Sequence, residues 1–181
     1  MSLRIIGIDI RHDDAYAVQV RAGMKKVQIE ATAQVALSEH TTVEEDLRHL
    51  IGALCDQLDI SDAAVALSLP ADRFYIRRVD FPFRNSAKIR QALPFEIEAT
   101  LPVAAGTLAL DFLLLTQKQK GATQLVLAAA IDQSLLANCM TTLAEFAIEP
   151  ELVTVGAWPM AAAIAPPEPA HSASDDTDDS I

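Results

Sequence analysis

The sequence predicts an α+β fold, in which helices pack on sheets made largely of antiparallel strands. The first observation is a strand pair, 4–10 and 15–20, joined by turn residues and followed by a long alternating strand over 26–37. The second is a strand–strand–helix order that occurs twice between residues 65 and 147. The third is composition: 51% of the 181 residues are hydrophobic, which is enough to bury a core of ordinary size.

A strongly amphipathic segment follows the three opening strands. Its apolar residues recur at helical spacing, and its first turn is rich in carboxylates, which the positive end of a helix favours. Thr41 or Thr42 is expected to cap it. The sequence therefore predicts a helix over 43–58. The apolar positions are Leu47, Leu50, Ile51, Leu54 and Leu58.

Residues 65–102 are the most densely patterned part of the chain. A short apolar strand, 65–69, stops at Pro70, because proline has no backbone N–H to offer the ladder and biases the residue before it toward extended backbone. A second strand, 74–81, is rich in aromatic and β-branched residues and ends before Pro82. The pattern predicts two strands with a turn between them.

A proline lies inside the helix that is predicted after these strands. Asn85 and Ser86 are good N-cap residues, so the helix is expected to begin near Ala87. Pro94 removes a hydrogen bond and its ring clashes with the preceding turn, at a cost of about 3 kcal/mol in a helix interior. We therefore predict that the helix breaks or kinks at Leu93 and that Pro94 opens a second segment.

The rest of the chain repeats the same kinds of element. Asp132 is expected to cap a helix whose apolar stripe runs from Leu135 to Phe146. The segment 166–181 is acidic and begins with prolines, which is typical of a linker without a core. The other predicted elements are strands over 107–115 and 122–131 with a polar turn at 117–121, a strand over 151–155 and a helix over 156–165.

The order of these motifs resembles one protein family. It is similar to the inserted subdomain of PilM of type IV pilus assembly and of the L protein of type II secretion, actin-like proteins related to the cell-division protein FtsA. The opening strand also resembles the start of the actin-like ATPase fold. The matching residues are the run IGIDI at 6–10, Leu69-Pro70, Pro82, the run ALPFEIE at 92–98 and Leu101-Pro102.

The resemblance covers residues 4–165 and implies an α+β chain in which an actin-like first subdomain, present in part, carries an inserted subdomain with two helices and an antiparallel sheet. The family continues with a second half that completes the nucleotide cleft, so we expect the chain to be a piece of a longer protein or a reduced homologue. The expected parts are 1–62 for the start of the actin-like subdomain, 63–150 for the insertion, 151–165 for the return strand and helix, and 166–181 for a disordered linker.

Asp9 is the one candidate cofactor-binding residue. It matches the aspartate that holds Mg²⁺ through water in actin-like ATPases, so the resemblance implies ATP and Mg²⁺ as ligands. The turn that follows, Arg11-His12-Asp13-Asp14, has no glycine or hydroxyl residue, whereas phosphate needs close backbone N–H groups and no neighbouring carboxylates. We therefore expect no cofactor, with ATP and Mg²⁺ left for a complete two-domain protein and a solvated or capped strand-end aspartate as the alternative.

A basic and aromatic cluster stands out in an otherwise acidic chain. Arginine and aromatic residues concentrate in interface cores, so the cluster predicts a docking surface for an acidic peptide or domain. In the alternative, the aromatics are core residues and the arginines pair with Glu96 and Glu98. The candidate partner-binding residues are Arg73, Tyr75, Arg77, Arg78, Phe81 and Arg84, interleaved with Phe74 and Phe83.

Charge and motif content argue against several classes of function. The net charge of −11 disfavours nucleic-acid binding, and no stretch approaches the ~18 to 20 apolar residues that span a bilayer. The serines and the four histidines lack the context of a nucleophile or a metal site. Cys55 and Cys139 stand apart and are expected to be small buried residues in a reducing compartment.

These observations favour a non-enzymatic scaffold. The resemblance implies a cytoplasmic protein of a type II secretion or type IV pilus inner-membrane platform, peripheral to the membrane through its partners. The partners would be the cytoplasmic tail of an inner-membrane assembly protein and the secretion ATPase, and a homodimer is left open. One alternative is a nucleotide-dependent actin-like switch that uses Asp9, and another is an unrelated α+β ligand-binding domain.

Overall fold

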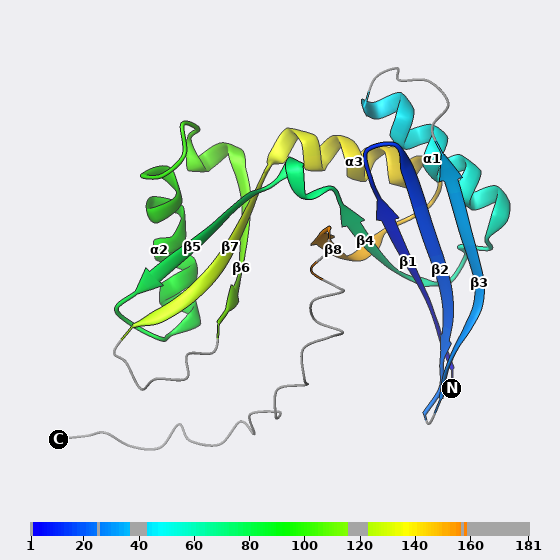
Figure 1. The fold of residues 1–181 in the computed structure, drawn as a ribbon, viewed down its shortest axis with the longest axis horizontal. Helices are drawn as coiled ribbons and strands as arrows, with labels where there is room; N and C mark the ends of the chain where they lie inside the picture. Colours follow the sequence, from blue (N-terminus) through cyan, green and yellow to red (C-terminus); the bar gives the residue numbers. More distant parts are fainter. Residues whose placement is uncertain (1, 25, 37–42, 116–122, 157, 159–181) are drawn as a thin grey trace.

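The structure is a computed structural model that describes residues 2–24, 26–36, 43–115, 123–156 and 158. These residues form two sheets joined by α3 (Gln133–Glu145), which extends from one toward the other (Figure 1). The predicted α+β class is confirmed. The predicted N-cap at Thr41 or Thr42, the turn 117–121, the linker 166–181 and all but residues 156 and 158 of the last helix lie outside the described residues.

The first sheet has five strands in the order β3-β2-β1-β4-β8. The opening three strands are an antiparallel meander, as predicted, and β4 and β8 continue the sheet in parallel with β1. The bounds are Leu3–Ile10 for β1, Asp14–Ala22 for β2, Val27–Ala36 for β3, Ala64–Leu69 for β4 and Pro150–Val155 for β8.

One face of this sheet is covered by α1 (Val43–Gln57) and α3. Every second residue of β1, namely Ile6, Ile8 and Ile10, is buried against them, as strand alternation requires. The two helices approach closely at Gly52, where an added Cβ would stand 3.4 Å from the Phe146 ring. Among the described residues, helices therefore cover one face of the sheet, and the opposite face carries none.

Both cysteines have the structural role that the sequence predicts. Cys139 is 6% exposed in the first core, and burial raises the pKa of its thiol to about 11. Cys55 is half-buried against the same core, and burial raises its pKa as well. Neither forms a disulfide, so both act as small apolar residues.

An ion pair links the exposed sides of α1 and α3. The Nε and Nη2 atoms of Arg48 donate to the Glu145 carboxylate at 2.7 and 2.9 Å, and this bonding lowers the pKa of Glu145 below its ordinary 4.5. A depressed carboxylate pKa adds stability above the unfolded pKa and loses it as pH falls through the folded value. We therefore expect wild type to be more stable than Arg48→Met at neutral pH, with a gap that closes below pH 4.5 in urea titrations.

The second sheet has three antiparallel strands in the order β5-β7-β6, and α2 (Ser86–Glu98) covers one of its faces (Figure 1). Its core is a separate cluster of apolar side chains. The strands are Tyr75–Phe81 for β5, Leu108–Leu114 for β6 and Gln124–Asp132 for β7, with short 3₁₀ turns at Ala71–Arg73 and Ala105–Thr107. The buried core residues are Phe81, Ile89, Leu93, Ile97, Leu101, Leu108, Val126, Ala128 and Ala130.

The boundary of the inserted subdomain differs from the predicted 63–150. Strand β4 pairs with β1 and β8, because Val65, Leu67 and Leu69 bury their side chains in the first core. Helix α3 packs against α1 with Cys139 and Leu143 buried in that same core. Segment 63–150 does contain two helices, but only β5, α2, β6 and β7 build the second unit.

The predicted break of the helix at Leu93, with Pro94 opening a second segment, does not occur. Helix α2 is continuous over Ser86–Glu98, and its predicted N-cap is confirmed because the Asn85 side chain accepts the Lys88 N–H at 3.0 Å. Ile89, Leu93 and Ile97 recur at every fourth position and are all buried on the sheet. Burial on both sides of Pro94 therefore holds the helix together across the missing hydrogen bond.

Asp132 caps α3 as the sequence predicts. Its carboxylate accepts the backbone N–H groups of Ser134 and Leu135 at 2.8 and 3.3 Å, and the bonds from Ser134 lower its pKa. The cap also lies where the chain passes between the two units, since Ala130 belongs to the second core and Ile131 to the first. Among the helices that the structure describes, none is long and apolar enough to cross a membrane.

Candidate functional site

A hollow of about 690 Å³ lies on the open face of the first sheet, near the carboxyl ends of the parallel strands β1, β4 and β8. Open sheets with parallel strands bind ligands outside these strand ends. The hollow therefore lies where a ligand of such a sheet is expected. The hollow is lined by residues that include Gly7, Asp9, Arg11, Tyr16, Val18, Ala66, Ser68, Ala71, Thr154 and Gly156.

Small side chains create the floor of the hollow. Gly7 lies opposite Val18 on one side and Ala66 on the other, and Val18 lies opposite Thr32. A Cβ added at Gly7 would meet Val18 Cγ1 at 3.5 Å. A row of glycine, alanine, valine and threonine leaves space that larger side chains would fill. The floor of the hollow is therefore formed by short and mostly apolar side chains.

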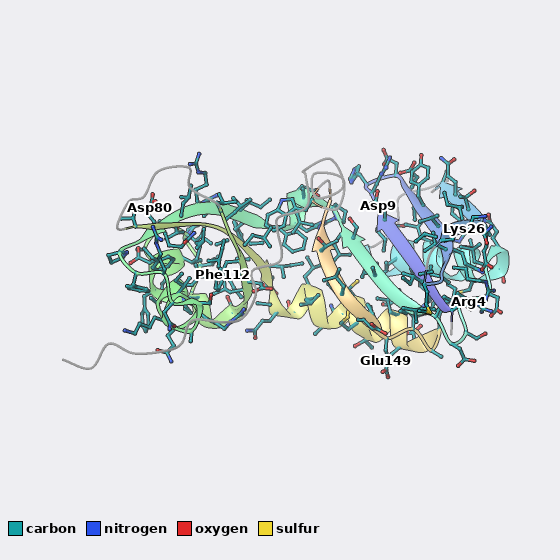
Figure 2. The ribbon with its side chains drawn as sticks, turned by 90° about the horizontal axis from the view of Figure 1, so that it is seen from below. Arg4, Asp9, Lys26, Asp80, Phe112 and Glu149 are labelled. Carbon is teal, nitrogen blue, oxygen red and sulfur yellow. The ribbon has the colours of Figure 1, made fainter. Side chains whose placement is uncertain are left out.

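The turn after β1 closes one end of the hollow with an ion pair. The Arg11 Nε donates to Asp9 Oδ2 at 2.9 Å, and the guanidinium carbon stands 4.3 Å from the centre of the Tyr16 ring. The hydrogen bond to Asp9 raises the pKa of Arg11. Figure 2 places Asp9 at the end of β1, beside the connection to the second unit. Arg11 is therefore held between a carboxylate and an aromatic face.

Tyr16 is fixed by its own polar contacts. Its hydroxyl accepts Gln34 Nε2 at 2.8 Å, and the neighbouring carboxylate of Asp14 raises the pKa of the phenol. The backbone N–H of Arg11 donates to the Asp14 carbonyl at 2.9 Å and closes the turn. The rim of the hollow is therefore a connected set of side chains from β1, β2 and β3.

The residues at Asp9 do not fit a nucleotide with Mg²⁺. The Asp9 carboxylate already has a cation, the Arg11 guanidinium, and the Arg11 N–H is used within the turn instead of pointing at a ligand. Asp13 stands 69% exposed in the same turn, where its charge opposes a phosphate group. The sequence predicts that residues 11–14 are a poor phosphate site. The ion pair of Asp9 with Arg11 adds a second obstacle, because it occupies the carboxylate that would face Mg²⁺.

The far end of the hollow is formed where β4 and β8 end together. Ser68, 8% exposed, donates its hydroxyl to the Gly156 carbonyl at 3.2 Å, and the Gly156 N–H donates to the Leu69 carbonyl at 2.8 Å. Gly156 has φ of +30°, and an added Cβ would stand 3.4 Å from Ala71 Cβ. These bonds fix the chain at the junction of the two units, beside the hollow.

The predicted docking cluster does not form one surface. Phe81 is 2% exposed in the second core, so its inclusion among the partner-binding residues is wrong. Strand alternation puts Tyr75 and Arg77 on the face of β5 that α2 covers and Arg78 on the other. The structure places Arg73 in the 3₁₀ turn beside the hollow, half-buried, and Tyr75, Arg77, Arg78 and Arg84 at exposed positions.

The alternative interpretation of this cluster is right for its three phenylalanines, but Tyr75 is exposed. Phe83 packs on the second core with its ring centre 5.5 Å from that of Phe81, and Phe74 packs on the first core. Within the described residues, however, no ion pair joins Arg73, Arg77 or Arg78 to Glu96 or Glu98. These arginines therefore keep their charge available at the surface.

Arg11 and Tyr16 are the site residues that the sequence reading missed. Asp9 and Arg11 are two positions apart, and Asp9 lies directly opposite Tyr16 in the hairpin register. Once strands 4–10 and 15–20 are predicted as a hairpin, this register puts an aspartate, an arginine and a tyrosine on one face. The register of the predicted hairpin would therefore have been enough to place Arg11 and Tyr16 beside Asp9.

Two solved structures have a similar arrangement of elements. One is the cytoplasmic domain of EpsL, an inner membrane component of the type II secretion system of Vibrio cholerae, with a TM-score of 0.55 and 14% identity over 83% of this chain and 57% of that chain. The other is the PilM–PilN type IV pilus biogenesis complex, with a TM-score of 0.72 and 20% identity over 88% of this chain and 50% of that chain. The chain has the PilM fold.

The similarity to both structures, together with the order of the elements, confirms the α+β fold class that the resemblance implied. This chain spans about half the length of both solved proteins. No protein-family model and no curated protein matches it. The likeness is therefore one of fold, and the role of these solved proteins does not pass to this chain with it.

Proposed function

We propose that this chain is an assembly scaffold of a type II secretion or type IV pilus inner-membrane platform. The observation that carries the proposal is the PilM fold, which recurs in a type II secretion component and in the PilM–PilN complex. In this proposal the chain works in the cytoplasm, at the inner membrane, and holds the cytoplasmic segment of a membrane protein. It acts by binding and has no enzymatic activity.

We place the bound segment in the hollow beside the junction of the two units. A space of about 690 Å³ accepts a few side chains of an extended peptide, and its floor of Gly7, Val18 and Ala66 favours apolar ones. Arg11 and Tyr16 at the rim offer polar contacts that would fix the direction of the peptide. Arg77 and Arg78, exposed on the second unit, remain candidates for an acidic partner such as the secretion ATPase.

Nucleotide is not part of this proposal. A nucleotide-dependent switch would need Asp9 to exchange Arg11 for Mg²⁺, and the turn that follows would still bring two carboxylates toward the phosphates. A peptide carries no triphosphate and needs no such exchange. The Asp9–Arg11 pair therefore supports a binding role over nucleotide hydrolysis.

Filling the hollow is expected to abolish partner binding. In Ala66→Phe the new ring would occupy the space above Gly7 and Val18, so affinity for a peptide of the partner's cytoplasmic segment should fall about tenfold or more in calorimetric titration. Ala87→Phe, an exposed position at the start of α2, is the matched control and should leave affinity unchanged. Failure of the wild type to bind at high micromolar peptide, or equal binding by Ala66→Phe, would contradict the proposal.

A further inference from the structure

The hairpin between β2 and β3 exposes a continuous apolar patch at the end of the sheet away from the hollow. Leu3 lies opposite Ala22, which lies opposite Val27, and in the next row Val20 lies opposite Ile29. We call Leu3, Met24, Val27 and Ile29 the hairpin patch; they are 54, 96, 67 and 70% exposed. Apolar side chains that gather in neighbouring rows mark an interaction surface, whereas scattered ones do not.

The turn holds Met24 at the tip of the hairpin. The backbone N–H of Gly23 donates to the Lys26 carbonyl at 2.9 Å, which closes a tight turn around Met24. Figure 1 shows the hairpin end at one extremity of the molecule, beside the N-terminus. A short closed turn loses little conformational entropy when it contacts a surface. The tip of the hairpin is therefore suited to contact an extended surface.

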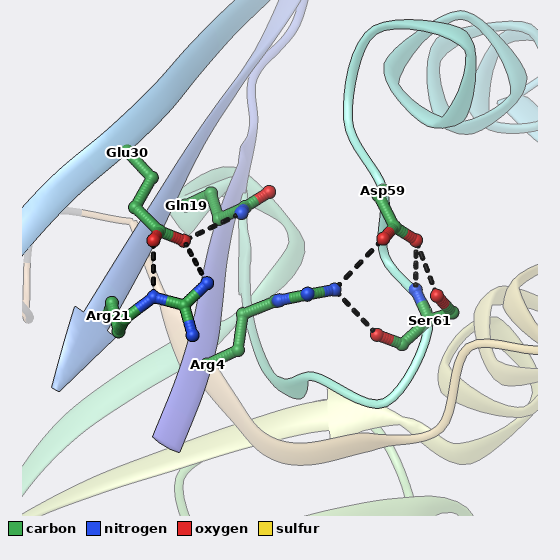
Figure 3. A network of polar contacts seen from close by, with 6 residues as sticks. All are labelled: Arg4, Gln19, Arg21, Glu30, Asp59 and Ser61. Carbon is green, nitrogen blue, oxygen red and sulfur yellow. Dashed lines mark hydrogen bonds and ion pairs between the residues drawn. The ribbon is translucent and has the colours of Figure 1, made fainter. Parts of the chain in front are cut away.

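The hairpin patch is bordered by positive charge in a chain of net charge −11. The sequence of the tip has Arg21, Lys25 and Lys26 and no acidic residue between positions 21 and 29. Figure 3 shows how Arg21 is neutralised: its guanidinium bonds Glu30, which also accepts Gln19 Nε2.

The other arginine near the hairpin end is neutralised in the same way. Arg4 donates to Asp59 at 3.0 Å and to the Ser61 carbonyl at 3.1 Å (Figure 3). Lys26 is exposed, and none of the ion pairs within the described ranges engages it. Lys26 is therefore a charge that remains beside the hairpin patch.

We infer that the hairpin patch contacts an anionic lipid surface. Met24 and Val27 would enter the headgroup region while Lys26 pairs with lipid phosphates, the arrangement that interfacial membrane binding favours. Such contact needs no helix that crosses the bilayer. A second copy of the chain is a poorer occupant, because symmetric pairing would bring Lys26 of both copies together.

Vesicle sedimentation of the full chain tests this inference. At low salt the wild type should bind vesicles of phosphatidylglycerol and phosphatidylcholine about fivefold more than vesicles of phosphatidylcholine alone, and added salt should remove the difference. Met24→Ser with Val27→Ser, and separately Lys26→Glu, should each lower binding to anionic vesicles about fivefold. Leu113→Ser and Leu152→Ser, at 51 and 57% exposure on other strands, are matched controls that should bind like the wild type.

Three outcomes would overturn the inference. The first is no sedimentation of the wild type with anionic vesicles, and the second is an equal loss in the Leu113 and Leu152 controls. The third is a change in solution mass by sedimentation equilibrium in the Met24 and Val27 variant without a change in vesicle binding, which would assign the patch to self-association. The assay contains no protein partner, so its result is independent of the proposed scaffold function.

Discussion

Phe81→Ala is expected to lower the free energy of unfolding by about 3 to 5 kcal/mol. The Phe81 ring is 2% exposed at the end of β5 and fills the second core together with Ile89 and Val126. Removal of the ring leaves a cavity that a three-stranded sheet with one covering helix cannot close by collapse. Urea unfolding of the wild type and the variant, followed by circular dichroism, measures the difference.

Tyr75→Ala is the control for this prediction. Tyr75 lies on the same strand and on the same face as Phe81, but it is 37% exposed, so its loss should destabilise the chain far less. A Phe81→Ala variant that keeps nearly wild-type stability and loses partner binding instead would contradict the structure. It would restore the sequence-based interpretation of Phe81 as a docking residue.

Most of the strands and helices could be predicted because their signals are local. Alternation along 26–37, helical spacing in 43–58 and the caps at Asn85 and Asp132 each depend on residues within or next to one element. Such patterns are the same whichever element the strand or helix packs against. Boundaries in the structure differ from the predicted ones by a residue or two, since frayed ends carry little pattern.

The assignment of elements to sheets could not be predicted in the same way. The alternation of Val65, Leu67 and Leu69 fits a strand of either sheet, and only its pairing with β1 and β8 decides between them. The apolar stripe of α3 likewise predicts that one face of the helix is buried, but it does not identify the sheet or helix on which that face packs. Its contact with α1 joins segments far apart in the sequence, so no window along the chain contains it.

The candidate site was predictable in part. Asp9 was proposed because the resemblance matches it to the aspartate that holds Mg²⁺ in actin-like ATPases, and the poor phosphate turn follows from residue types alone. The pairing of Asp9 with Arg11 and the stacking on Tyr16 depend on side-chain direction in a hairpin register. The separation of Phe81 from Arg78 depends on the same property, because neighbours in a strand sequence point to opposite faces.

Pro94→Ala is expected to raise the free energy of unfolding by about 2 kcal/mol. An interior proline destabilises a helix by about 3 kcal/mol relative to alanine. Proline also lowers the conformational entropy of the unfolded chain, which stabilises the folded state by up to about 1 kcal/mol and reduces the net cost. Because α2 is continuous through Pro94, alanine at this position could donate its backbone N–H to the Arg90 carbonyl. For a chain of 181 residues the midpoint of thermal unfolding should rise by about 4 to 8 °C.

Pro102→Ala separates this effect from a general benefit of removing proline. Pro102 lies beyond the end of α2, where its ring interrupts no helical hydrogen bond, so alanine there should change stability little or lower it slightly. If Pro94→Ala were instead neutral or destabilising, packing of the Pro94 ring beside Leu93 would outweigh the recovered hydrogen bond. A gain confined to Pro94→Ala means that α2 carries an interior proline at a cost, which burial of Ile89, Leu93 and Ile97 offsets.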